Sequence, residues 1–232
     1  MINKKIAIFD IDGTIFRKNL HFELISELVW LKVFPQSTKK ELVKLYSKWL
    51  EHRGTYESYR EALVKLYAKQ IKGCRAKDVI NASKIVVPFH KNRTYVFAEK
   101  LITKLKSNNY HIIAVSGSPI EVVKEFNKLH LDFDEVFGTV YEMDERNIYT
   151  GEERFAPVRN KGQLIKQYIF ENKLELENSY GVGDTESDAS FLKLVDNPIA
   201  FNPNYNLKEI AEKNNWQIVV EKKDVIYKIN QK

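Results

Sequence analysis

The sequence lacks a pair of cysteines, a long uncharged apolar run, internal repeats and low-complexity segments. Its single cysteine, Cys74, excludes an intramolecular disulfide and is consistent with a reducing compartment. The chain has 232 residues, of which 44% are hydrophobic and 29% are charged, as in an ordinary soluble globular protein with a hydrophobic core. This length accommodates one large domain, or a core domain with a smaller insertion.

No stretch of the sequence has the pattern of a membrane or export segment. The N-terminal residues MINKKIAIFD contain an apolar run that is too short for a signal peptide. The most apolar longer stretch, FELISELVWLKVF, carries Glu23, Glu27 and Lys32, which argues against a membrane span. We therefore expect a cytoplasmic protein that has no membrane partner.

The formal net charge of +6 raises the question of a nucleic-acid partner. Lysines and arginines are spread along the chain with acidic residues nearby, as in STKKELVKLYSKW. Mixed runs of this kind are typical of solvated helix faces, so we expect no nucleic-acid partner, and a basic nucleic-acid binder is retained as an alternative. A modest positive field would also attract small anionic molecules.

Apolar periodicity divides the chain into a helical block and a region of alternating strands and helices. Residues 5–9 are expected to form a strand, and the segments from about 19 to 87 repeat apolar residues at three- and four-residue spacing, which predicts helices. After Pro88, further strands are expected in HIIAVSG, DEVFGTVYEMDERNIYTGE, SYGVGD, PIAFN and WQIVV. Strands that alternate with helices indicate a parallel sheet covered on both faces.

The helical block interrupts this alternation directly after the first strand, so it is best explained as an insertion. The sequence therefore predicts an α/β protein with a doubly wound, Rossmann-like parallel-sheet core (residues 1–17 and 89–232) and an inserted all-helical cap domain (residues 18–88). Within the cap, Thr38 and Glu41 fit a capping box, and Thr55 is another expected helix cap.

Polar residues follow the expected strands or open the helices next to them. They are Asp10, Asp12, Ser116, Gly117, Ser118, Lys161, Asp184, Glu186 and Asp188. In open α/β sheets, ligands bind beyond the carboxyl ends of the strands, so these residues are expected to meet in one site. Several carboxylates without His or Cys indicate a hard cation, and Mg²⁺ suits a site that also receives phosphate. A cation and a lysine would allow the paired carboxylates of Asp10 and Asp12 to remain buried.

Four of these segments also resemble a known family. DIDGT, VSGS, the lysine of NKG and GDTESD occur in the order and approximate spacing of the four motifs of the haloacid dehalogenase-like (HAD) phosphohydrolases. The resemblance spans residues 6 to about 204, and the first and fourth motifs together are highly specific. The helical insertion resembles the cap of the phosphoserine-phosphatase-like branch, subfamily IB.

The resemblance implies a role for each matching residue. Asp10 would be the nucleophile that forms an aspartyl-phosphate, and Asp12 would protonate the leaving alcohol and then activate water. Ser116 and the backbone amide of Gly117 would hold phosphate oxygens. Lys161 would stabilise the charge on the nucleophile and on the phosphoryl group.

The resemblance also implies a Mg²⁺ site. Asp10, the backbone carbonyl of Asp12, and Asp184 would bind the ion, and Asp188 would orient these ligands. Taken alone, an aspartate at a strand end is often a turn or helix cap, and Ser116 could also be a cap. Glu186 is expected on the loop surface rather than at the metal, and Asn202 is either a turn residue or part of the site edge.

The cap gives less information about the substrate. Phosphoserine phosphatases carry a glutamate nine residues after the nucleophile that grips the substrate amine, and this chain has Asn19 there, which argues against phosphoserine. Arg17 and His21 are the expected substrate-binding residues at the cap entry, where Lys18 and Glu23 also lie.

Aromatic residues of the cap have two possible roles. Tyr56, Tyr59 and Arg60 could line a pocket, but aromatic residues at helical spacing are more often part of a core. Trp30 and Phe34 are expected in the core of the cap.

The leading hypothesis is a Mg²⁺-dependent phosphomonoesterase, monomeric or homodimeric, that hydrolyses a small phosphorylated metabolite through an aspartyl-phosphate. A phosphomutase with the same nucleophile is the nearest alternative, because it would differ chiefly in excluding water. A non-catalytic module that binds a phosphate ligand or a protein on this fold is the alternative from a different class.

Overall fold

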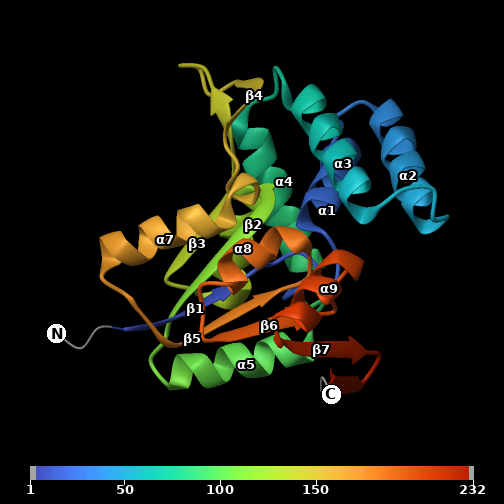
Figure 1. Cartoon of the computed structure of the whole chain (residues 1–232). Helices are drawn as coiled ribbons and strands as arrows, with labels where there is room; N and C mark the ends of the chain where they lie inside the picture. Colours follow the sequence, from blue (N-terminus) through green and yellow to red (C-terminus); the bar gives the residue numbers. More distant parts are fainter. Residues whose placement is uncertain (1–3, 230–232) are drawn as a thin grey trace.

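A computed structural model describes residues 4–229, and its centre is a sheet of eight strands. Figure 1 shows this sheet between the helices. The strand order is β4-β3-β2-β1-β5-β6-β7-β8. The strands are β1 (Lys5–Phe9), β2 (His111–Pro119), β3 (Glu135–Met143), β4 (Tyr149–Phe155), β5 (Glu175–Gly183), β6 (Asn197–Phe201), β7 (Gln217–Lys222) and β8 (Val225–Ile229). The helices are α1 (Leu20–Trp30), α2 (Gln36–Leu50), α3 (Tyr56–Ile71), α4 (Ala76–Phe89), α5 (Val96–Ser107), α6 (Ile120–Phe126), α7 (Lys161–Asn172), α8 (Ala189–Leu192) and α9 (Tyr205–Lys213).

The six inner strands run parallel, and β4 and β8 pair antiparallel to β3 and β7 at the two edges. This arrangement confirms the expected α/β fold with a doubly wound sheet. The edge strand β8 was not expected from the sequence; its segment VIYKI is apolar but short, and its residues are largely exposed.

Strand β1 is apolar throughout because both faces of the sheet are covered. Ala7 and Phe9 pack in one core cluster, and Ile6 and Ile8 pack in the other. The second cluster is completed by side chains of α7, α8 and α9. The first cluster extends without a break from α5 and α6 into α1, α3 and α4, so the inserted helices share a core with the sheet.

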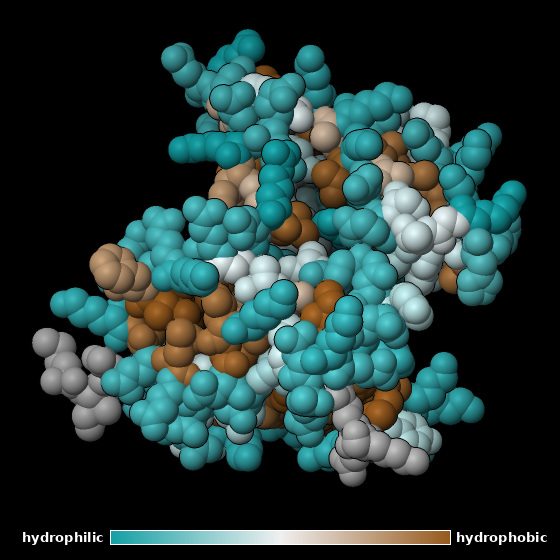
Figure 2. Space-filling view, in the orientation of Figure 1, coloured by the Kyte–Doolittle hydropathy of each residue, from teal (hydrophilic) through white to brown (hydrophobic). Residues whose placement is uncertain are grey.

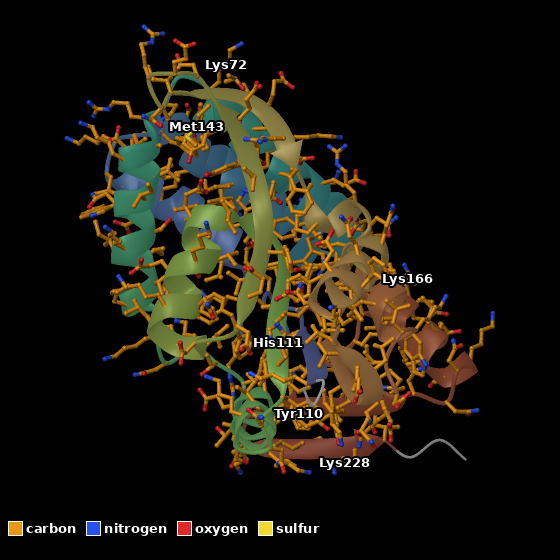
Figure 3. The ribbon with its side chains drawn as sticks, turned by 90° about the vertical axis from the view of Figure 1, so that its left-hand side faces the viewer. Lys72, Tyr110, His111, Met143, Lys166 and Lys228 are labelled. Carbon is orange, nitrogen blue, oxygen red and sulfur yellow. The ribbon has the colours of Figure 1, made fainter. Side chains whose placement is uncertain are left out.

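The inserted helices are fixed to the sheet at one end by backbone hydrogen bonds. The loop after α3 pairs with the β3–β4 hairpin, with Gly73 N–H donating to the Tyr149 carbonyl at 2.8 Å and Tyr149 N–H donating to the Cys74 carbonyl at 2.9 Å. Figure 3 shows Lys72, which follows α3, and Met143, which ends β3, at the same end of the molecule. The division into a core (1–17, 89–232) and a cap (18–88) remains a prediction, and residues 1–3 and 230–232 lie outside the described residues.

The helix starts in the cap differ in part from the expected ones. Thr55 caps α3 as expected, because its side chain accepts a hydrogen bond from Ser58 N–H. The prediction of a capping box at Thr38 and Glu41 is wrong. Helix α2 begins one turn earlier, after Pro35, and Thr38 is buried inside it. The fixed backbone of proline suits the extended residue before a helix, so it competes with a threonine cap.

Hydrophilic side chains are distributed over most of the visible surface (Figure 2), as expected from charges that are spread along the sequence. Figure 2 shows a largely hydrophilic face, with apolar side chains gathered beside α7. Among the described residues, no helix is both long enough and apolar enough to span a membrane.

Candidate active site

The carboxyl ends of β1, β2 and β5 lie at one edge of the sheet, as predicted from the polar residues that follow these strands. In Figure 3, Tyr110 and His111 at the start of β2 lie at the opposite end of the molecule from Met143 at the end of β3, so the parallel strands point towards the inserted helices. At this edge, Lys161 Nζ lies 2.6 Å from Asp10 Oδ1 and 2.7 Å from Asp188 Oδ1. It also donates to the Val115 carbonyl at 3.1 Å. One buried ammonium therefore joins β1, β2 and the loop after β5.

Lys161 is the first residue of α7, where a cation opposes the helix dipole. Asn160 caps this helix through its side chain, which accepts from Gln163 N–H. Burial alone would lower the pKa of Lys161, but the charges of Asp10 and Asp188 outweigh it and hold the pKa above its usual value. The lysine is therefore charged and is held in place by the two carboxylates.

Asp10, Asp184 and Asp188 form a cluster that fits a divalent cation. One carboxylate oxygen of each lies within 4.8 Å of the others. Asp10 Oδ2 is buried and has no hydrogen-bond partner among residues 4–229. Burial, together with the charges of Asp188 and Asp12, raises the pKa of Asp10 to about 7, although Lys161 opposes the shift. Burial and the charges of Asp10 and Asp188 raise the pKa of Asp184 well above its usual value. An unpartnered buried oxygen amid crowded carboxylates is what a Mg²⁺ site requires.

The turn after β1 is shaped so that Asp184 can approach. Gly13 has a φ of +90°, and a Cβ atom at this position would lie 2.0 Å from Asp184 Oδ2. Only glycine combines this backbone conformation with that close approach. The glycine of DIDGT therefore allows the first and fourth motifs to touch.

Asp188 orients the loop that carries Asp184. Its Oδ2 accepts from the backbone N–H groups of Asp184 and Thr185, each at 3.0 Å. Asp188 is completely buried. Glu186, by contrast, accepts hydrogen bonds from Asn204 and Asn206 and is not part of the carboxylate cluster.

The carboxylate of Asp12 accepts hydrogen bonds from two serine hydroxyls and a backbone N–H, whereas Asp10 is held by Lys161. Its Oδ2 accepts from the hydroxyls of Ser116 and Ser118, both at 2.7 Å, and its Oδ1 accepts from Leu20 N–H at 2.6 Å. Burial raises the pKa of Asp12, although these hydrogen bonds oppose the shift. The start of α1 and the end of β2 therefore fix this carboxyl beside Asp10.

A small cavity of about 40 Å³ opens onto these groups. It is lined by Asp10, Asp12, Gly117, Ser118, Lys161, His21 and Arg60, among others. His21 and Ser118 were expected here, and the pocket-lining alternative holds for Arg60. Ser116 lies behind the cavity wall, fully buried against Asp12.

His21 is the most unusual side chain of this cavity. It is buried, its ring lies edge-on to Tyr67 at a centroid distance of 4.6 Å, and its Nε2 has no hydrogen-bond partner among the described residues. Burial, with the nearby charge of Arg60, lowers the pKa of His21 to about 3. The imidazole is therefore neutral at physiological pH.

A second cavity, of about 460 Å³, adjoins the first and shares Asn19, Tyr56, Asp184 and Thr185 with it. Tyr56 and Tyr59 line this cavity, so the pocket-lining alternative holds for them. Phe34 is buried in the core as expected, but Trp30 is 77% exposed and the expectation that it is core is wrong. Trp30 is the last residue of α1, and among residues 4–229 no element covers most of its side chain.

Two other residues of the larger cavity also stand out in the sequence. Arg17 lines it and forms an ion pair with Glu221, which lies 204 residues later in the chain. Asn202 lines it as well, so this residue lies at the site edge.

Comparison with known proteins agrees with this arrangement. Residues 7–193 match the family described as haloacid dehalogenase-like hydrolase. The chain is a haloacid dehalogenase-like hydrolase. The match covers the strand-end segments that carry Asp10, Lys161 and Asp188 and all of the inserted helices.

Two curated relatives of this HAD hydrolase are phosphatases of similar length. A phosphoserine phosphatase of Methanocaldococcus jannaschii is 26% identical, with 96% of this chain and 94% of that protein covered. A histidinol-phosphatase of Neisseria meningitidis is 23% identical, with 93% and 98% covered. A solved structure of a Bordetella pertussis protein of unknown function has the same fold, with a TM-score of 0.76, 18% identity and coverage of 93% and 98%. The HAD hydrolase thus lies on the phosphoserine-phosphatase-like branch.

Proposed function

We propose that this HAD hydrolase is a Mg²⁺-dependent phosphomonoesterase that acts on a small phosphorylated metabolite through an aspartyl-phosphate on Asp10. The main support for the proposal is the way the two carboxylate oxygens of Asp10 are bound. Lys161 holds one of its oxygens and the other is buried without a hydrogen-bond partner among the described residues, beside Asp184 and Asp188. Most buried polar atoms in folded proteins have a hydrogen-bond partner, so an unpartnered carboxylate oxygen beside two further carboxylates supports a cation at this position.

The Mg²⁺ ion would be held by Asp10, Asp184 and the backbone carbonyl of Asp12, with Asp188 orienting the loop that carries Asp184. When bound, the ion supplies positive charge that lets an anionic carboxylate approach an anionic phosphate. The raised pKa values of Asp10 and Asp184 support this assignment, because they reflect burial and, in addition, the charges of the neighbouring carboxylates.

Asp10 would attack the phosphorus atom, and the bond between phosphorus and the ester oxygen would break. Asp12 would give a proton to the departing alkoxide, and its raised pKa favours the protonated form needed for this step. Asp12 would then take a proton from water, which attacks phosphorus and releases phosphate and free Asp10. The hydrogen bonds from Ser116, Ser118 and Leu20 keep the Asp12 carboxyl oriented throughout.

The phosphate oxygens would lie in the small cavity, against Lys161, the Gly117 amide and the cap residues Arg60 and His21. Ser116 would act through Asp12, since its hydroxyl is committed to that carboxyl. Fixed positive charge and donors at this position would stabilise the transferring phosphoryl group.

The two curated relatives carry the names of different substrates, so neither substrate is transferred to this chain. Asn19 argues against phosphoserine, because its side chain accepts from Phe22 N–H and caps α1. An amide at this position has no charge to offer a substrate amine. A cytoplasmic location and a monomeric or homodimeric state remain predictions.

The test is phosphate release from p-nitrophenyl phosphate in Mg²⁺ and in EDTA, for wild type and Asp10→Asn. We expect turnover that requires Mg²⁺ and falls by at least about 10³-fold in the variant, because the nucleophile is lost. Asp132→Asn is the matched control, since Asp132 is fully exposed and its substitution should leave turnover unchanged.

Turnover retained by Asp10→Asn would remove Asp10 as the nucleophile. Interconversion of sugar phosphates without steady phosphate release would favour the mutase. Ligand binding with no turnover of any ester would favour a binding module.

A further inference from the structure

The larger cavity beside the phosphate site has a wall made of aromatic rings. Five rings from three helices form it: Phe22 from α1, Tyr46 and Trp49 from α2, and Tyr56 and Tyr59 from α3. Each ring has a neighbour with its centroid 5.3 to 6.0 Å away, and Trp49 and Tyr59 are stacked with an interplanar angle of 17°. The rings therefore form one continuous apolar surface rather than scattered core residues.

This wall begins where the phosphate site ends. Tyr56 lines both cavities, and burial, together with the charges of Asp184 and Asp12, raises its pKa. A molecule whose phosphate lay against Lys161 would place its next atoms beside Tyr56. The alcohol part of the ester would then extend along the aromatic wall.

The charged groups of the larger cavity already have protein partners. Glu23 lies 3.1 Å from Lys18 Nζ, 3.1 Å from His90 Nε2 and 3.5 Å from Arg93 Nη1. Arg17 pairs with Glu221 and lies over the Tyr95 ring. Of the described residues that line this cavity, only Glu23 and Asp184 carry carboxylates, and Asp184 belongs to the cation cluster. The aromatic wall thus has no free carboxylate to hold a cationic alcohol.

The size of the cavity also indicates a substantial leaving group. A volume of about 460 Å³ lies in the range that accommodates drug-sized ligands. Flat rings gain more from such a wall than saturated groups of equal size, because ring faces and edges attract one another beyond simple area burial.

From these observations we infer that the substrate is a phosphate monoester whose alcohol carries a flat, uncharged unsaturated ring, bound against Trp49, Tyr56 and Tyr59. This inference rests on the proposed phosphatase function and specifies its substrate class. The aromatic wall would select the substrate, while the carboxylates and Lys161 would carry out the chemistry.

The test compares two esters that differ only in the flatness of the ring, phenylethyl phosphate and cyclohexylethyl phosphate, with glycerol phosphate and phosphocholine as ring-free and cationic references. We expect kcat/KM for the phenyl ester to exceed that for the cyclohexyl ester by about tenfold. Trp49→Leu should reduce this ratio to about threefold or less, whereas the exposed Trp30→Leu, the matched control, should leave it unchanged. Because each variant is judged by a ratio of two substrates, a partial loss of folded protein does not alter the result.

A binding measurement distinguishes between two negative results: that the inferred substrate class is wrong, and that the proposed phosphatase function is wrong. Calorimetry with phenylethylphosphonate and cyclohexylethylphosphonate, which cannot be hydrolysed, measures ring preference without turnover. Turnover or binding without a preference for the phenyl compound would overturn the inference alone, as would a preference for phosphocholine. A phenyl preference in binding with no hydrolysis of any ester would instead uphold ring selection and reject the phosphatase.

Discussion

At the scale of single residues, Lys161 shows how ion pairs stabilise buried charges in this site. Its side chain is 2% exposed, and it is held by carboxylates of Asp10 and Asp188. Removing Lys161 would leave the carboxylates of Asp10 and Asp188 buried without a counter-charge, and breaking a buried ion pair in this way typically costs about 3–5 kcal/mol. The site therefore depends on charges that balance one another, and a divalent cation would complete that balance.

His21 provides a prediction for the pH dependence of stability. Its pKa is about 3 in the folded protein and about 6.5 when exposed, so between these values the unfolded state binds the extra proton. The stability that the neutral imidazole contributes is fully present above pH 6.5 and is lost as the pH falls towards 3. At pH 5 the loss is about 2 kcal/mol relative to pH 8.

The variant His21→Phe retains an aromatic ring against Tyr67 but cannot bind a proton. Urea unfolding of wild type and variant at pH 8 and pH 5 isolates the contribution of His21, because all other titrating groups are common to both proteins. The wild type should lose about 2 kcal/mol more than the variant between the two pH values. Equal losses would show that the imidazole is protonated in the folded state.

At the scale of secondary-structure elements, the contact between α3 and the β3–β4 hairpin fixes one end of the inserted helices. Gly151 in β4 has a φ of +89°, and a Cβ there would lie 3.0 Å from the Ala68 carbonyl and 3.1 Å from Lys72 Cβ. Gly73, in the loop that the hairpin pairs with, has a φ of +83°, and a Cβ there would meet no other atom within 4 Å. The two glycines have similar positive φ values, and they differ in the space around them.

These glycines form a matched pair for a stability measurement. Gly73→Ala should cost about 1 kcal/mol, because alanine is strained at positive φ. Gly151→Ala should cost about 1–3 kcal/mol more, because the added methyl group also meets the backbone of α3. Chemical denaturation of both variants measures the difference. Equal costs would mean that the hairpin moves away from α3 without penalty, so that this end of the cap is not fixed.

At the scale of the whole molecule, the carboxylate cluster should make stability depend on Mg²⁺. An ion that binds only the folded state adds about 2.7 kcal/mol at 100 times its dissociation constant. For a chain of this length that corresponds to a rise in Tm of about 5–10 °C. We expect this rise in MgCl₂ relative to EDTA at matched ionic strength.

The variant Asp184→Asn should lose the Mg²⁺ response and, in EDTA, should be at least as stable as wild type. Burial, together with the charges of Asp10 and Asp188, raises the pKa of Asp184, so its charge is unfavourable without a cation and removing that charge relieves both effects. A wild-type Tm that is identical in MgCl₂ and in KCl would contradict a metal site at this cluster.

The α/β fold and the meeting of the motif residues could be predicted because both follow from local patterns. The apolar run before Asp10 requires a strand that is buried on both faces, and parallel strands bring their carboxyl ends to one edge. Asp10, Lys161 and Asp188 are therefore neighbours although they lie far apart in the sequence. The capping box at Thr38 could not be judged in this way, since Pro35 offered an equally good helix start nearby.

The sequence by itself determined the parallel strands of the sheet, the helices that follow β1 and the identity of the charged residues at the strand ends, because strand and helix periodicity are local properties. Only the tertiary structure decided that Tyr56 and Tyr59 line a cavity, that Arg60 reaches the phosphate side, and that Trp30 is exposed. Helical spacing tells which side chains share a face, but not whether that face meets another helix, solvent or a cavity. That choice depends on how the inserted helices pack over the sheet, which is a property of the whole chain.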